Sequence, residues 1–310
     1  MPLLDYDDAR EIVLARAPGP DPDRVETVPL AEAFGRVLAR DAVSDVDLPP
    51  FDKAAMDGFA LCAADVAKTP AFLEVTMDIP AGGAPDGPLG PGQAAAVMTG
   101  APVPAGADAV VQVEWTSGFG ERRVVIKNGV PRGRNLSPRG EILERGATAV
   151  PAGRRIDAER AALLAAVGCD PVPVHERPSL AILSTGDEVV PASSAPGPSQ
   201  IRDANGPALA AFARSYGLEP VLLDPSADDA ISLRRAVSAG LAHDVLLVSG
   251  GVSAGAYDFV EDVLADLGVE AHTRRLAVKP GKPTVFGTRG RQIVFGLPGN
   301  PVSAIVIARV

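Results

Sequence analysis

The chain has 310 residues, of which 46% are hydrophobic and 22% charged, and its formal net charge is −10. This composition is typical of a folded protein of about two domains and excludes a disordered chain. A general nucleic-acid binder needs a basic surface, so the acidic charge argues against that class. An anionic ligand would require a local group of lysines and arginines.

The cysteines and histidines form no metal-binding pattern. Cys62 and Cys169 lie far apart and outside any metal-ligand spacing, which favours reduced thiols in a cytoplasmic protein. His175, His243 and His272 are equally scattered, so we expect neither zinc nor histidine-based catalysis. The first residues lack the apolar run of a signal peptide, and no segment has the roughly 20 apolar residues that cross a bilayer.

The first and third parts of the chain have a helical pattern. Apolar residues at helical spacing predict helices at 5–16, 30–40 and 158–167. We group these helices into one discontinuous helical linker domain, residues 1–45 and 146–177.

The segment between these helices is rich in β-like runs. Short apolar stretches separated by glycine and proline predict strands, at 58–61, 72–75, 95–98, 109–113 and 124–126. The stretch 79–92 is a loop by its composition. Residues 46–145 are therefore expected to form an inserted β-rich domain, a small barrel or sandwich.

From residue 178 to 310 strands alternate with helices. Apolar runs predict strands at 180–183, 221–223, 245–248, 284–286 and 293–295, and helices are predicted at 205–216, 228–239 and 257–267. This alternation predicts a doubly wound, mostly parallel sheet, so the chain as a whole is an α/β multidomain protein. Ligands of such sheets lie beyond the carboxyl ends of the strands. Three polar loops are expected there: STGDE, SGGVSAG and LPGNP.

The loop SGGVSAG, residues 249–255, is a candidate anion site. It joins a buried strand to a helix, its glycines allow close approach of a ligand, and the N–H groups of the helix start favour negative charge. Ser249 and Ser253 add hydroxyl donors. Asp258 follows closely, which suggests a bridging cation or a group that handles a proton or water. The alternative is an ordinary tight connection, because glycine-rich loops are common.

Two lysines and two carboxylates are further candidates. Lys279 and Lys282 lie on the proline-flanked turn KPGKP, where they suit phosphate or an oxyanion, although a solvated surface turn has the same pattern. Asp187 and Glu188 either join Asp258 as a cation-handling cluster or serve as a loop cap and an exposed acid.

Two helix starts and two turns are also polar. Asn300 is a candidate N-cap, and residues 202–206, RDANG, offer a base-edge or ribose contact. In the β-rich segment the turns DKAAMDG and MTGAPVP stand out, although such turns are ordinary. Arg132, Arg134 and Arg139 form a basic loop that would ordinarily face solvent.

Seven stretches, taken in order, carry a family resemblance. They are LPPFDKAAMDGFAL, MTGAPVPAGADAVV, GRNLSPRGE, ILSTGDEVV, SGGVSAGAYD, KPGKP and GLPGNPVSA. Together they resemble the molybdopterin molybdenumtransferase (MoeA) family, also known as the gephyrin E-domain family. The resemblance implies insertion of molybdate into adenylylated molybdopterin, with release of AMP and of molybdenum cofactor. It implies Mg²⁺ as the divalent cation, with molybdate and adenylylated molybdopterin as substrates.

The resemblance also implies an assembly and partners. It implies an elongated homodimer in which the β module of one subunit faces the doubly wound domain of the other. Molybdopterin adenylyltransferase and molybdoenzymes are the implied protein partners, with neither nucleic acid nor a membrane involved.

Site residues carry over motif by motif. The catalytic residues implied are Asp57, Glu188 and Asp258, of which Glu188 and Asp258 are also the implied metal ligands. The implied substrate-binding residues are Thr99, Gly100, Ser184, Thr185, Gly186, Asp187, Ser249, Gly250, Gly251, Ser253, Gly255, Lys279, Lys282, Pro298, Asn300 and Pro301.

Two departures from the family pattern leave alternatives open. An acidic pair usually follows the glycine of the GRN…RGE loop, whereas here Glu141 is followed by Ile142. The family chain continues into a small C-terminal β domain, which is absent here because this chain stops at Val310. We therefore expect ligand binding with slow turnover. A binding-only homologue and the related molybdopterin adenylyltransferase are the alternatives to an active insertase.

Overall fold

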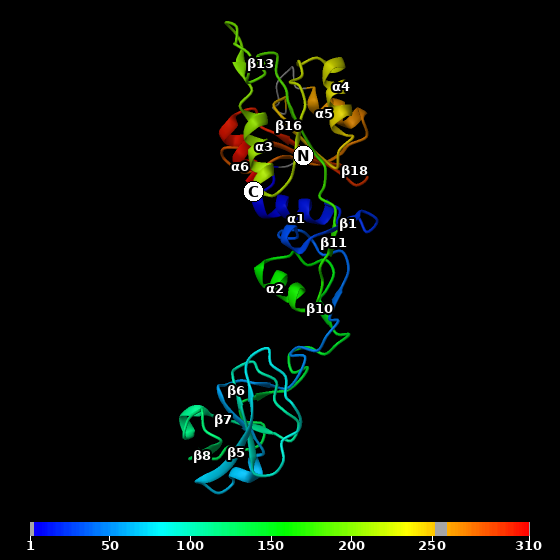
Figure 1. The fold of residues 1–310 in the computed structure, drawn as a ribbon. Coiled ribbons are helices and arrows are strands. Elements are labelled where there is room, and N and C mark those ends of the chain that lie inside the picture. The colour runs from blue at the N-terminus through cyan, green and yellow to red at the C-terminus, as the bar shows by residue number, and fades with distance from the viewer. Residues whose placement is uncertain (1–2, 252–258, 310) are drawn as a thin grey trace. The chain divides into compact units, whose positions relative to one another are not determined.

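A computed structural model describes residues 3–251 and 259–309 (Figure 1). Its contacts divide the chain into two compact units. Unit 1 comprises Met1–Glu26 and His175–Val310, and unit 2 comprises Thr27–Val174. Among the described residues, no helix is long and apolar enough to cross a membrane.

Unit 1 is built on a six-stranded sheet in the order β15-β12-β16-β19-β18-β17. The bounds are β12 Leu180–Ser184, β15 Val221–Leu222, β16 Val245–Ser249, β17 Glu270–Arg275, β18 Pro283–Arg289 and β19 Gln292–Leu297. β15, β12, β16 and β19 are parallel, whereas β18 and β17 are antiparallel to their neighbours. The predicted mostly parallel sheet is confirmed, with an antiparallel meander at one edge.

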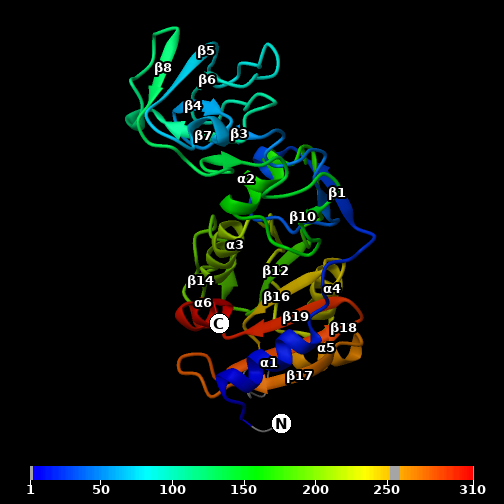
Figure 2. The same cartoon turned by 90° about the horizontal axis from the view of Figure 1, so that it is seen from below.

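Helices cover both faces of this sheet (Figure 2). α3 (Asn205–Ser215), α6 (Pro301–Arg309) and α1 (Tyr6–Arg16) pack with Leu180 and Ile182 of β12, while α4 (Ala230–Gly240) and α5 (Val260–Asp266) pack with Ala181 and Leu183. Successive residues of β12 thus enter opposite cores, as the pleat of a strand requires. The doubly wound arrangement follows.

The placement of α1 differs from the predicted linker domain. Asp5 caps the helix by accepting from the backbone N–H of Asp8, as its sequence suggests, but Ala9 is buried in the core of unit 1. A helical period shows which side of a helix is apolar, and it does not show which core that side will meet. Residues up to Glu26 therefore belong to unit 1.

The predicted helix at 30–40 is wrong. Only Leu30–Glu32 forms a short 3-10 turn, η1, and Gly35 has a φ of +76°. Val37 and Leu38 then make isolated β-bridges to Arg155 and Val174. The apolar spacing was misleading because glycine readily leaves the right-handed region and ends the helix.

Unit 2 contains a five-stranded sheet in the order β7-β4-β6-β5-β8. The bounds are β4 Gly58–Leu61, β5 Ala71–Ile79, β6 Gln93–Val97, β7 Ala109–Gln112 and β8 Arg123–Ile126. Phe59 and Ala60 enter two different apolar clusters, so both faces of the sheet are covered. Each predicted β-like run overlaps one of these strands, but β5 continues to Ile79, well past the predicted 72–75.

The rest of unit 2 consists of short elements, some of them around a separate apolar cluster. Around it lie α2 (Ala158–Ala166) and β2 (Ala42–Val43), which pairs with β10 (Thr148–Val150). By contrast, η2 (Ala63–Val66), η3 (Val113–Trp115) and β3 (Lys53–Ala54), which pairs with β9 (Leu136–Ser137), pack with the two clusters of the five-stranded sheet. β1 (Val25–Val28) pairs with β11 (Val172–His175), and in unit 1 β13 (Val189–Val190) pairs with β14 (Ile201–Arg202). The linker segments and the inserted segment 46–145 fall within one contact unit, so the predicted boundaries at 45 and 146 stay a prediction.

Candidate functional site

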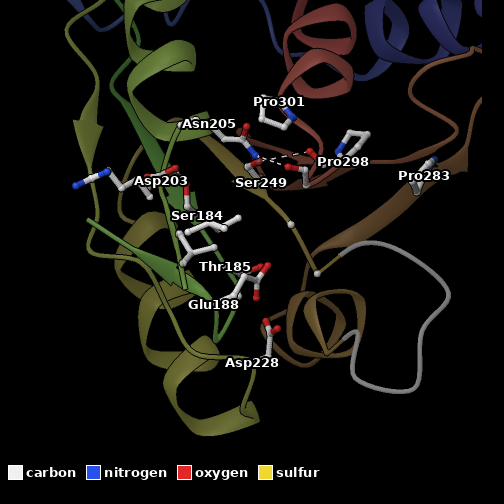
Figure 3. A pocket seen from close by; sticks show the side chains of 18 residues that line it. Ser184, Thr185, Glu188, Asp203, Asn205, Asp228, Ser249, Pro283, Pro298 and Pro301 are labelled. Carbon is white, nitrogen blue, oxygen red and sulfur yellow. Dashed lines mark hydrogen bonds between the residues drawn. The ribbon is translucent and has the colours of Figure 1, made fainter. Parts of the chain in front are cut away.

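The site of unit 1 lies at the carboxyl edge of its sheet. β12, β16 and β19 are parallel and in register from Ser184 to Ser249 and Leu297, so the loops that follow them meet. β18 runs antiparallel to β19, which brings its first residue, Pro283, to the same edge. A cavity of about 360 Å³ opens there, and the picture of its walls shows side chains from all of these segments (Figure 3).

The glycine turn after β16 allows close contact with the loop after β12. Gly250 and Gly251 have φ values of +100° and +63°, which side chains rarely tolerate. A Cβ on Gly250 would lie 2.7 Å from the carbonyl oxygen of Thr185. The Thr185 side chain is buried beneath this turn, with 5% of the residue exposed. Both glycines are thus required by the close approach.

Polar side chains tie the start of α3 to the strand ends. Ser184 Oγ donates to Asp203 Oδ1 at 2.9 Å, and the same oxygen accepts from the Gly206 N–H at 2.9 Å. Asn205 Nδ2 donates to Ser249 Oγ at 2.7 Å and to the Gly299 carbonyl at 2.8 Å. The RDANG segment is therefore part of the cavity wall.

The cavity has more acidic than basic side chains. Glu188, Asp203 and Asp228 line it, against Arg202 as the cationic side chain among its described lining residues. In Figure 3 the carboxylates of Glu188 and Asp228 lie toward one end of the cavity, and Asn205 and Ser249 toward the other. An anionic ligand would therefore need a cation or further basic groups to bind here.

Two of these carboxylates are of the kind that would hold a magnesium ion together with waters and substrate oxygens. In residues 3–251 and 259–309 no group of three or more acidic, histidine or cysteine side chains forms a complete metal site. Mg²⁺, however, is usually held by one or two carboxylates together with waters and phosphate oxygens. Glu188 and Asp228 supply two such carboxylates in the cavity.

Many of the site residues predicted in unit 1, catalytic Glu188 and substrate-binding residues alike, line this cavity. They are Ser184, Thr185, Gly186, Glu188, Ser249, Gly250, Gly251, Pro298 and Pro301. Ser253, Gly255 and Asp258 lie outside the described residues.

Four other predicted residues lie at the same edge but not in the cavity wall. Asp187 accepts from the Asp228 N–H at 3.0 Å, which is the loop-cap alternative, and Asn300 accepts from Val302 and Ser303 at the start of α6. Lys279 and Lys282 are exposed on their turn.

Sequence reasoning missed several lining residues. Val189, Ile201, Asp228 and Pro283 received no role in the site, and Asp203 and Asn205 only a general one. The sequence predicts a helix that begins at Asp228, but α4 begins at Ala230 and its cap is Asp229, which accepts from Ile231 and Ser232. Two adjacent aspartates before a helix leave the choice of cap open, and that ambiguity was the available signal.

In unit 2, Asp57 and Thr99 form a pair. Asp57 Oδ1 accepts from Thr99 Oγ1 at 2.6 Å and from the Thr99 N–H at 2.7 Å. The hydroxyl bond, followed by the backbone bond, lowers the pKa of the Asp57 carboxyl below its usual value. Both residues are exposed, and Gly100 follows in the same turn. These residues lie in the DKAAMDG and MTGAPVP turns, which the fold thus brings together.

Each unit of the chain is matched by a model of a known protein family. A family model described as "MoeA N-terminal region (domain I and II)" matches residues 4–168, and one described as "Probable molybdopterin binding domain" matches residues 181–310. A molybdopterin molybdenumtransferase of Nostoc sp. is 38% identical over 314 residues, covering 98% of this chain and 72% of the relative. Molybdopterin molybdenumtransferase 2 of Mycobacterium tuberculosis is 39% identical over 296 residues, covering 90% of this chain and 71% of the relative.

Solved structures agree with these sequence matches. The crystal structure of a molybdopterin biosynthesis MoeA protein from Pyrococcus horikosii superposes with a TM-score of 0.78 at 34% identity, covering 99% of this chain and 78% of that one. With both units matched in order, the chain belongs to the molybdopterin molybdenumtransferase (MoeA) family of molybdenum cofactor biosynthesis.

Proposed function

We propose that this chain inserts molybdate into adenylylated molybdopterin, releasing AMP and molybdenum cofactor. The observation that carries the proposal is a single cavity that combines a left-handed glycine turn with carboxylates at the end of a parallel sheet. Glycines without side chains let a phosphate group approach the backbone of such a turn closely. The names of the relatives supply the substrate class.

The reaction requires cleavage of the phosphoanhydride that joins AMP to molybdopterin. An oxygen of water bonds to phosphorus, the bond from that phosphorus to the bridging oxygen breaks, and AMP leaves with the bridging oxygen. The attacking water loses a proton, which a carboxylate in the cavity accepts. We assign this role to Glu188, because its side chain lines the cavity and follows the STG loop directly. Mg²⁺, held by Glu188 and Asp228, would neutralise charge on the phosphates.

The proposal includes an assembly and a compartment. Asp57, Thr99 and Gly100 belong to the function only if they meet a ligand bound in unit 1. A homodimer, in which unit 2 of one copy meets unit 1 of another, provides such a surface. We further propose molybdopterin adenylyltransferase and molybdoenzymes as protein partners, and the cytoplasm as the compartment.

A second candidate is a homologue that binds the ligand without efficient turnover. Ile142, at the position where the resemblance implies an acid, is 70% exposed in the GRNLSPRGE loop. An exposed isoleucine can neither ligate a cation nor orient water. Changing Ile142→Asp should then raise Mg²⁺-dependent AMP release by about threefold, or about 0.7 kcal/mol. An unchanged rate would remove the isoleucine as the cause of slow turnover.

An anaerobic assay separates these functions. The purified protein is first titrated with adenylylated molybdopterin by calorimetry, and AMP release is then followed with and without molybdate and Mg²⁺. Binding with molybdate-dependent AMP release supports the insertase, and binding without AMP release supports the binding-only candidate. Formation of adenylylated molybdopterin from ATP and molybdopterin would instead indicate the adenylyltransferase. Absence of any binding would overturn the proposal.

A further inference from the structure

The cavity of unit 1 contains two incompletely hydrogen-bonded polar side chains. Among the described residues, the buried side-chain atoms without a hydrogen-bond partner are Thr185 Oγ1 and Asn205 Oδ1. Both residues line the cavity. Buried polar atoms are nearly always paired, and exceptions concentrate at functional sites.

The orientation of the Asn205 amide is fixed by its partners. One of them, the Gly299 carbonyl, can only accept a hydrogen bond, so the NH₂ group of Asn205 must face it. The same nitrogen donates to Ser249 Oγ. Both N–H groups are therefore used, and the oxygen is left without a partner.

The two acceptors belong to different loops of the carboxyl edge. Ser249 is the last residue of β16 and begins the glycine turn, whereas Gly299 lies in the loop between β19 and α6. These loops touch closely, since a Cβ on Gly299 would lie 3.6 Å from the Cα of Gly250. One further bond, from the Gly250 N–H to the Leu297 carbonyl at 3.1 Å, also joins them.

We propose that Asn205 is a positioning residue: from the first turn of α3, its amide holds the β19–α6 loop against the end of β16. The two loops are then held in the relative position that a ligand contacting both of them requires. The identity of that ligand, adenylylated molybdopterin, rests on the proposed function. Asn205 acts through the loops and takes no part in the chemistry.

Stability alone does not account for this amide. A buried oxygen without a hydrogen-bond partner lowers the free energy of unfolding. An amide in which only the N–H groups are hydrogen-bonded therefore contributes little to stability. The site requires the two N–H donors of Asn205, because the Ser249 hydroxyl and the Gly299 carbonyl, on two separate loops, each accept one hydrogen bond from them. Substitutions that remove the N–H groups of Asn205 therefore test the proposal, and Asn205→Asp does so with the least change of shape.

The test compares Asn205→Asp and Asn205→Ala with the unchanged protein. We expect both variants to bind adenylylated molybdopterin about tenfold more weakly, the range for losing hydrogen bonds at a site. Binding of AMP alone or molybdopterin alone should change less than about twofold, because a half-ligand does not need both loops in register. Anaerobic calorimetry measures all three affinities.

A pH series on Asn205→Asp gives a second readout. Its buried carboxylate faces the Gly299 carbonyl, so its pKa should be raised, and protonation restores one O–H donor. The affinity relative to the unchanged protein should therefore recover between about pH 8 and pH 5. Arg202, Asp203, Glu188 and Asp228 are the other charged groups that line the cavity, and all four are present in both proteins, so the affinity of the variant is expressed relative to that of the unchanged protein.

Gln292→Glu is the matched control. Gln292 Nε2 donates to the Leu241 carbonyl from the first residue of β19, at the end of the strand opposite the cavity, so this substitution removes the same kind of bond away from the cavity. It should lower the unfolding temperature without changing the ratio of whole-ligand to half-ligand affinity.

Three results would overturn the inference. Equal losses for the whole ligand and both halves would indicate a general structural role. Retained affinity in Asn205→Asp at neutral pH would mean that the oxygen, not the NH₂ group, serves the ligand. If the unchanged protein binds neither the whole ligand nor its halves, the proposed function fails and this inference fails with it.

Discussion

The predicted site residues of unit 1 surround a cavity, whereas those of unit 2 are exposed on its surface. In unit 1, residues from three separate loops surround one cavity and are joined by hydrogen bonds to the start of α3. In unit 2, Asp57 and Thr99 are exposed, bond to each other, and are not among the residues that line the cavity beside Phe59 and Phe119 on that unit's sheet. Unit 1 therefore has the surfaces needed to hold a ligand, whereas the unit 2 residues need another surface in order to act.

The difference has a topological cause. Parallel strands end at one edge, so three connections of unit 1 deliver their polar residues to the same place. The sheet of unit 2 is largely antiparallel, and its turns place side chains at the periphery. Variants of both units test whether unit 1 binds the ligand while unit 2 only assists.

The largest expected effect is on chemistry in unit 1. Glu188→Gln keeps the size of the side chain but removes the proton acceptor and one proposed Mg²⁺ ligand, so AMP release should fall by about 10²- to 10⁴-fold, while ligand affinity measured without Mg²⁺ should be kept. Rapid-quench measurement of AMP and calorimetry of the ligand give the two values. Glu219→Gln, on an exposed acid of the same unit, should change neither. An unchanged rate for Glu188→Gln would move the proton acceptor elsewhere.

The next effect tests whether unit 2 assists a second copy. Asp57→Asn should slow AMP release, because the variant lacks the carboxylate that accepts from Thr99. If the site is shared between copies, mixing Asp57→Asn with Glu188→Gln forms some heterodimers with one intact site. About a quarter of the unchanged activity should then return. Failure to recover activity, with subunit exchange verified by mass spectrometry, would argue for sites confined to one chain.

A smaller effect is expected from the exposed lysines of unit 1. Lys279→Ala or Lys282→Ala should weaken ligand binding by about 1 kcal/mol, the low end for charge-assisted bonds, because both side chains are solvated. The loss should shrink as salt rises from about 0.05 to 0.5 M, since exposed charges are screened. Calorimetry at the two salt concentrations measures it. Unchanged affinity in both variants would return this turn to an ordinary surface role.

The smallest expected effect concerns the stability of unit 1. Asp244 accepts from Arg24 at 2.8 and 2.9 Å and from the backbone and hydroxyl of Ser179. Burial acts to raise the pKa of this carboxyl, but the bonds from Arg24 and Ser179 outweigh it and hold the pKa below its usual value. Asp244→Asn should lower the free energy of unfolding by about 1 kcal/mol at pH 7.

The pH dependence of this contribution follows from its sign. A lowered folded pKa stabilises the protein above the unfolded value of about 3.9, and the contribution is lost as pH falls through the folded value. Urea unfolding at several pH values should show the unchanged protein and Asp244→Asn converging in acid. Asp266→Asn, which removes the exposed ion pair with Arg234, should cost less than about 0.5 kcal/mol. Equal losses for the two variants would contradict a special role for Asp244.

Much of the local structure of both units was predictable because its signals lie close together in the chain. Short apolar runs fix the strands, and caps such as Asp5 and Asp157 fix helix starts by bonds that span only three residues. Because ligands of parallel sheets bind at the carboxyl ends of the strands, the sequence also predicts the edge of the sheet at which the cavity lies. Local propensity failed at 30–40, where one glycine ended the helix.

The sequence by itself therefore determined the family, the strands of both sheets and the loops that form the cavity. Only the tertiary structure decided that α1 packs in unit 1, that Asp228 and Asn205 line the cavity, and that Lys279 and Lys282 remain exposed beside it. The physical reason is range. Strand, cap and turn preferences depend on neighbours a few residues apart, whereas the partners of Asn205 are 44 and 94 residues away in the chain. A contact of that kind exists only after the sheet has brought distant loops together.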